Sequence, residues 1–227
     1  MRMKIVRFSI FITVLVVGLL MIPIWASADL IFNLGTGNSD ISAYSGPYAQ
    51  VDVHLTDSTH ATITFKSLTN SGNIYLLGDG SSAAVNVNAS SWTLGSIITG
   101  SNAGTGFTPG PWSGDGSKNV DGFGVFNQTI KSDDGFTSSS DTISFSLTDN
   151  SGTWADAGSV LTGNADGWLA AAHIFVTSSP ANAENGAVVT GFASGVTQVP
   201  EPGTILLLIT GLLGLAVYGR MKIGTMK

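Results

Sequence analysis

The chain contains no cysteine, so disulfide bonds, thiol nucleophiles and thiolate metal ligands are excluded. Arginine is absent from residues 29–198, where the only cations are Lys66, Lys118 and Lys131. The same span holds fourteen of the fifteen acidic residues, which leaves it with a formal net charge of −11. Nucleic acids and anionic lipids bind cationic surfaces, so we expect neither as a partner of this span.

Motifs of common hydrolases and nucleotide-binding proteins are missing as well. There is no Gly-x-Ser-x-Gly elbow, no His-Glu-x-x-His and no Gly-Lys-Ser/Thr phosphate loop. Glu184 is the one glutamate of residues 29–198, so a pair of catalytic carboxylates would have to come from aspartates. Most aspartates stand beside Gly, Asn or Ser, where turn formation explains them. We therefore expect a protein without enzymatic activity. A hydrolase would need two aspartates that the fold brings together.

The amino terminus has the features of a cleaved signal peptide. Arg2, Lys4 and Arg7 precede an apolar stretch at 8–22, which Pro23 ends. Small residues then form a cleavage signature at Ala26-Ser27-Ala28. The sequence predicts a signal peptide over 1–28, removed by signal peptidase during export, with Asp29 as the new terminus. An uncleaved signal anchor is the alternative.

The carboxyl end combines a proline motif, an apolar segment and a basic tail, preceded by a short tether at 195–198. Residues 204–218 carry no charge and would form a helix about 22 Å long. This is shorter than the roughly 30 Å of bilayer hydrocarbon, so flanking residues must contribute to a membrane crossing. The signal at 199–227 comprises the motif Val199, Pro200, Glu201 and Pro202, the helix 204–218, and the basic residues Arg220 and Lys222.

This carboxyl end resembles the PEP-CTERM sorting domain of proteins exported by Gram-negative bacteria. The resemblance implies processing near the Pro-Glu-Pro by an exosortase, a membrane-embedded cysteine transpeptidase. It also implies insertion of the helix in the inner membrane before processing, then delivery to the cell surface or to an extracellular polysaccharide matrix. A permanently anchored periplasmic protein is the alternative.

Between the termini, residues 29–194 are rich in Gly, Ser, Thr, Asn and Asp and contain short alternations of apolar and polar residues. This pattern predicts an all-β body, an antiparallel sandwich or jelly roll of about nine short strands. In the hairpin 50–66, a loop at 57–59 would pair Leu55 with Ala61, Val53 with Ile63 and Val51 with Phe65, although a five-residue loop satisfies the same parity. The segment 141–147 predicts a strand with Ile143, Phe145 and Leu147 inward.

Three further segments give weaker expectations. Gly78-Asp79-Gly80 suggests a second hairpin between 73–77 and 84–88. The glycine- and proline-rich stretch 100–121 is expected to be a long surface loop. Residues 153–161 predict a short helix, and 168–176 a buried strand.

Several side chains are candidate ligands. His54, His60 and Asp52 share the polar face of the first hairpin and would suit a transition metal, unless the histidines are simply solvated. The aspartate-rich turns are an alternative calcium site, and no other cofactor is expected. Any of the tryptophans Trp92, Trp112, Trp154 and Trp168 would stack on sugar rings if exposed; Trp112 is the one expected to be exposed, whereas His173 is expected in the core. These features predict a structural or interaction component of the cell surface or polysaccharide matrix, or alternatively a carbohydrate-binding module.

Overall fold

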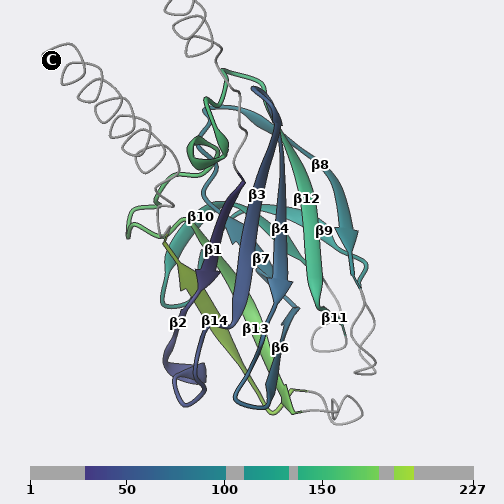
Figure 1. Cartoon of the computed structure of the whole chain (residues 1–227), viewed down its shortest axis with the longest axis vertical. Coiled ribbons are helices and arrows are strands. Elements are labelled where there is room, and N and C mark those ends of the chain that lie inside the picture. The colour runs from purple at the N-terminus through teal and green to yellow at the C-terminus, as the bar shows by residue number, and fades with distance from the viewer. Residues whose placement is uncertain (1–28, 101–109, 133–137, 179–186, 197–227) are drawn as a thin grey trace, which may run out of the picture.

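Two antiparallel β-sheets pack against each other as a sandwich (Figure 1). The computed structural model describes residues 29–100, 110–132, 138–178 and 187–196. In spatial order, the five-stranded sheet contains β1 (Leu30–Leu34), β3 (Ala49–Asp57), β4 (His60–Ser67), β12 (Thr142–Asp149) and β8 (Trp92–Thr99). The main path of the nine-stranded sheet is β11 (Ser139–Ser140), β6 (Asn73–Gly78), β13 (Ala170–Ser178), β7 (Ala83–Val85), β10 (Gly124–Lys131) and β9 (Ser113–Val120).

Three more strands extend the nine-stranded sheet. β14 (Val189–Gly195) pairs with β13 and with β2 (Thr36–Gly37), and β5 (Thr69–Asn70) pairs with β6. The predicted all-β antiparallel sandwich is confirmed. The described residues form fourteen strands where about nine were expected. Three of the additional strands have only two residues each, which sequence alternation cannot reveal.

The predicted hairpin has the expected register. β3 and β4 pair Val51 with Phe65, Val53 with Ile63 and Leu55 with Ala61. These six side chains are buried between the sheets. A slip of one residue would turn them all toward solvent, so burial of this face determines the register.

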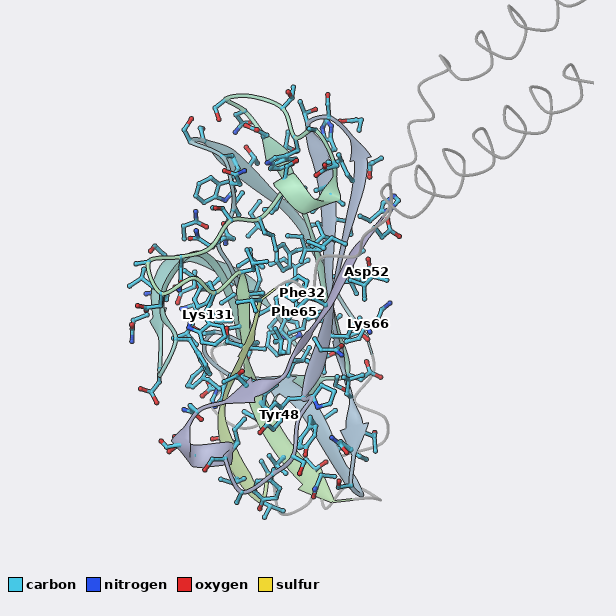
Figure 2. The ribbon with its side chains drawn as sticks, turned by 60° about the vertical axis from the view of Figure 1, so that its left-hand side comes forward. Phe32, Tyr48, Asp52, Phe65, Lys66 and Lys131 are labelled. Atoms are coloured by element: carbon cyan, nitrogen blue, oxygen red, sulfur yellow. The ribbon has the colours of Figure 1, made fainter. Side chains whose placement is uncertain are left out.

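β12 continues the same pattern on the next strand. Ile143 lies opposite Phe65, Phe145 opposite Ile63 and Leu147 opposite Ala61, so the three predicted inward residues of β12 are buried. The rings of Phe65 and Phe145 stack with centroids 6.3 Å apart. Figure 2 shows Phe32 and Phe65 between the sheets, while Asp52 and Lys66 lie on the outer side.

The second predicted hairpin is wrong. β6 and β7 do not pair with each other, because β13 lies between them: Phe175 is opposite Leu76, and Ala171 is opposite Ala84. β13 was expected to be a buried strand, and its described side chains are buried on both faces. Such a strand needs a partner along each edge, and this long-range pairing overrides the local turn.

The expected loop at 100–121 is only partly correct. Residues 101–109 lie outside the described ranges, whereas Ser113–Val120 form the edge strand β9 against β10. The pairing is irregular near Gly116, whose φ is +60°. Asp115 lies 3.4 Å from both Lys118 and Lys131, which puts charged groups on this edge strand, a common protection against pairing with another chain.

The expected helix at 153–161 is reduced to a single 3₁₀ turn, η3 (Ala157–Ser159). Asp156 caps it, since its Oδ1 accepts a hydrogen bond from the Ser159 amide at 2.8 Å. Trp154 anchors the segment by burying its ring and donating from Nε1 to the Asn88 carbonyl at 2.9 Å. Leu161 forms a β-bridge with Val87, and the Thr162 amide donates to the Asn86 carbonyl at 2.9 Å, so the chain leaves the helical conformation after one turn.

At Gly35 the chain crosses from one sheet to the other. β1 pairs with β3 in the five-stranded sheet, and β2 pairs with β14 in the nine-stranded sheet, just before the turn η1 (Ser39–Ile41). The end of β14 packs so closely here that a Cβ at Gly195 would overlap the Asn33 carbonyl oxygen. This crossing closes one corner of the sandwich and shapes the site described next.

Candidate functional site

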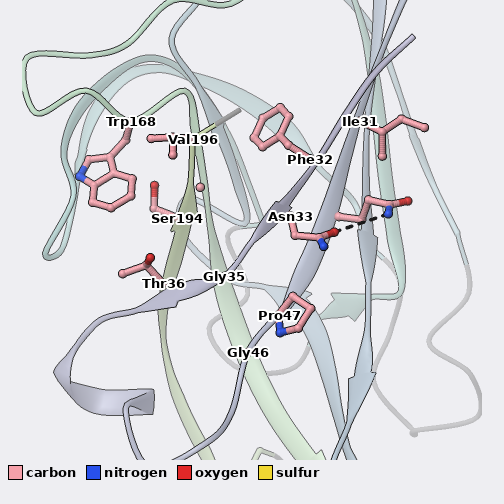
Figure 3. A pocket seen from close by; sticks show the side chains of 12 residues that line it. Ile31, Phe32, Asn33, Gly35, Thr36, Gly46, Pro47, Trp168, Ser194 and Val196 are labelled. Atoms are coloured by element: carbon pink, nitrogen blue, oxygen red, sulfur yellow. Dashed lines mark hydrogen bonds between the residues drawn. The ribbon is translucent and has the colours of Figure 1, made fainter. Parts of the chain in front are cut away.

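A groove opens at the corner where β1 continues into β2 (Figure 3). Its volume of about 540 Å³ lies in the range of small-molecule sites. The described residues that line it carry no charge and include no titratable side chain. They are Ile31, Phe32, Asn33, Gly35, Thr36, Gly46, Pro47, Gln50, Trp168, Ser194, Gly195 and Val196.

Trp168 forms one side of the groove and is half-buried (Figure 3). A tight turn positions it: Asn164 Oδ1 accepts from the amides of Asp166 and Trp168, each at 3.0 Å. Asn164 Nδ2 donates to the Phe123 carbonyl at 2.8 Å, and the Phe123 ring packs edge-on against the indole at 5.3 Å. The indole is therefore fixed before any ligand arrives.

The facing side is the loop that ends at Gly46-Pro47, and two tyrosines hold it. Tyr75 donates its hydroxyl to the Ser45 carbonyl at 2.8 Å, and Tyr48 donates to the Tyr44 carbonyl at 2.6 Å. Their rings lie 5.0 Å apart. Desolvation raises the pKa of both hydroxyls, so they remain protonated donors at neutral pH. Sequence reasoning missed this pair, because Tyr48 lies before the hairpin 50–66 and Tyr75 was placed in a hairpin that does not form.

The floor is apolar and the rim is polar. Phe32 is buried beneath the groove, and buried Ser194 donates to the Ala170 carbonyl at 2.7 Å. At the rim, Gln50 Nε2 lies 3.5 Å from Asn33 Oδ1, a long hydrogen bond between two side chains exposed enough to meet a ligand (Figure 3). An aromatic wall beside amide and hydroxyl groups suits a neutral polar molecule with one apolar face.

Val196 lines the groove, and the segment that follows it decides how this body is sorted. Residues 198–222 match the model of the PEP-CTERM protein-sorting motif. The chain carries a PEP-CTERM sorting motif. No curated protein and no solved structure matches the chain.

The PEP-CTERM match covers the predicted motif residues, the apolar segment 204–218 and the two basic residues, which are Val199, Pro200, Glu201, Pro202, Arg220 and Lys222. These residues, and the predicted cleavage residues Ala26 and Ala28, lie outside the described ranges. The described ranges contain no helix of the length and apolarity that a membrane crossing requires. The motif implies export, exosortase processing and sorting to the cell surface.

The two hairpin histidines lie on one exposed face but do not meet. His54 Nδ1 lies 2.6 Å from Asp29 Oδ1, and His60 Nδ1 lies 2.9 Å from Asp57 Oδ1. Asp52, the third proposed ligand, lies 3.6 Å from Lys66 Nζ instead. In the part of the chain that the structure describes, no three His, Asp or Glu residues gather in a metal-binding arrangement. The hairpin site therefore lacks a converging ligand set there.

Several aspartates have the turn roles that their neighbours predicted. Asp57 Oδ1 accepts from the Thr59 and His60 amides. The bond from the Thr59 amide, followed by the bond from the His60 side chain, lowers the pKa of Asp57 to about 2. Asp149 Oδ1 likewise accepts from the amides of Ser151 and Gly152, which lowers the pKa of Asp149. Calcium binding stays a prediction, and at Asp149 it would have to compete with these bonds.

Trp112 was predicted to be exposed, and this prediction is wrong. Trp112 is half-buried against the core, and a Cβ at Gly110 would lie 2.7 Å from the indole Cδ1. Gly110 has a φ of +93°, a turn geometry that brings the next residues back onto the body. Trp92 donates to Gln128 Oε1 at 3.1 Å, and Trp154 is buried. Among these four tryptophans, Trp168 is the one that lines the groove.

His173 is buried, as predicted, and is stacked on Phe192 with centroids 4.3 Å apart. Burial lowers its pKa below 6.5, and the charge of Asp79 and a hydrogen bond to the Gly80 backbone oppose this only in part. The unfolded chain binds the proton more tightly, so the stability that neutral His173 contributes is present above about pH 6.5 and is lost as the pH falls below it.

We expect the free energy of unfolding, measured by urea denaturation, to fall between about pH 7 and about pH 5. In His173→Phe this fall should be smaller, because the buried titrating group is gone while the aromatic stacking is retained. Asp57 and Asp149 titrate at lower pH, so they do not contribute to the fall in the free energy of unfolding between about pH 7 and about pH 5. An equal fall in both proteins would contradict the assignment to His173.

Proposed function

We propose that this protein is a non-catalytic component of the cell surface or of an extracellular polysaccharide matrix. The sorting motif at 198–222, directly after a folded sandwich, is the observation that carries the proposal. In this proposal the sorting motif directs the protein to the cell surface, and the β-sandwich body interacts with other components there.

The absence of catalysis is part of the proposal, and the positions of the acidic groups support it. Asp52, Asp57, Asp115 and Asp149 are engaged in ion pairs or turns. The groove is lined by uncharged residues among those described. A glycoside hydrolase would require two carboxylates facing one substrate site.

The test is to follow the full-length chain in an exosortase-containing bacterium by surface proteolysis and cell fractionation. We expect the body to be cut by protease added to intact cells and to be recovered with the polysaccharide fraction. In a strain that makes no polysaccharide, the body should be released into the medium. A body protected from protease and retained in the inner membrane in both strains would instead identify a permanently anchored periplasmic protein.

A further inference from the structure

We propose that the groove between Trp168 and the loop at Gly46-Pro47 binds a neutral sugar unit of an extracellular polysaccharide. This inference rests on the proposed function, since it names what the sorted body would bind. The candidate occupant is defined by charge, by the shape of the groove walls and by the polar groups at the rim.

The charges of the groove lining and of the surrounding body favour an uncharged ligand. The twelve lining residues provide no cation to pair with a carboxylate, sulfate or phosphate. The surrounding body, residues 29–198, has three lysines against fourteen acidic residues and repels anionic chains. A uronic acid or a phosphorylated sugar would lose solvation here without gaining an ion pair. A neutral hexose has no such cost.

The groove walls fit a ring with one apolar face. The axial C–H groups of a pyranose form such a face and pack on aromatic rings. Trp168 offers a ring already fixed by Asn164 and by the edge of Phe123, so binding costs little side-chain entropy. The volume of about 540 Å³ accommodates a small ligand and leaves room for adjoining units of a chain.

The rim supplies partners for hydroxyl groups. Asn33 and Gln50 each carry an amide donor and acceptor, and the 3.5 Å bond between them is long enough to be exchanged for bonds to a ligand. Thr36 adds an exposed hydroxyl at the other end of the corner. An uncharged wall of donors and acceptors matches the hydroxyl pattern of a sugar better than it matches a purely apolar ligand.

The test is binding of the surface-recovered protein to immobilised oligosaccharides, followed by titration calorimetry. We expect neutral hexose oligosaccharides to bind and uronate oligosaccharides of equal length not to bind. Trp168→Ala should weaken binding about tenfold or more, the loss produced by about 1.4 kcal/mol. Asn33→Ala should weaken binding less, and Trp168→Phe should retain part of it because an aromatic ring remains.

Trp92→Ala is the matched control. Trp92 is also half-buried, but it lies on β8, the edge of the five-stranded sheet opposite β1. Its removal should leave sugar affinity unchanged. The proposal is overturned if the wild-type protein binds no neutral oligosaccharide, prefers uronates, or loses affinity equally in Trp92→Ala and Trp168→Ala.

The surface fraction and the sugar binding of the wild-type protein together separate the two proposals. A wild-type protein at the surface that binds no sugar overturns the groove assignment and leaves the proposed function standing. A wild-type protein that never reaches the surface overturns the proposed function, whatever its purified form binds.

Discussion

Replacing Pro200 and Pro202 with alanine together with Glu201→Gln should leave the chain unprocessed and in the membrane fraction. The three residues form the centre of the sorting motif matched at 198–222. Proline restricts the backbone and favours extended conformations, and Glu201 carries the charge between the two prolines, so the triple variant removes both the restriction and the charge. Each loss of about 1.4 kcal/mol in recognition lowers the processing rate about tenfold.

The measurement is the ratio of processed to full-length protein in membrane and surface fractions. Glu184→Gln is the matched control, because Glu184 is the only other glutamate of the chain and lies outside the motif. The control should be processed like the wild-type protein. Normal surface delivery of the triple variant would show that sorting depends on another feature.

Phe65→Ala should destabilise the body by about 3–5 kcal/mol. The ring is fully buried, stacks on Phe145 at 6.3 Å and lies opposite Val51 and Ile143 on the neighbouring strands. Its removal leaves a cavity between two sheets that cannot collapse without breaking their register. A domain of this size has a total stability of about 5–15 kcal/mol, so much of it would be lost.

Urea denaturation measures this effect, with Ile98→Ala as the control. Ile98 lies on β8 with 65% of its surface exposed, so its truncation should change stability by less than about 0.5 kcal/mol. Similar losses in the two variants would mean that the core is not organised around the Phe65 contacts.

The sequence predicted the strands whose two faces differ. In β3, β4 and β12 the alternation is unbroken, and parity alone indicated which residues pair. β9 was not predictable in this way. Its residues Gly114, Asp115 and Gly116 are typical of loops, and the strand forms because β10 offers it an edge. Local propensity cannot report a partner that lies elsewhere in the chain.

The two candidate sites differ, for the same reason, in how far the sequence could predict them. The sorting motif is one contiguous segment, so its residue order alone identified it. The groove is assembled from the β1–β2 corner, the loop before β3, Trp168 and the end of β14, which are distant in sequence. Trp168 was one of four candidate tryptophans, and only the folded structure showed that it is the one of the four that lines the groove.

The intact mass of the protein recovered from each fraction of the cell, the surface and the cytosol included, tests the central claim, that this chain is a sorted cargo. A polypeptide that begins at Asp29 and ends before the apolar segment 204–218 is the predicted result. A full-length polypeptide of 227 residues, free in the cytosol, would contradict the account.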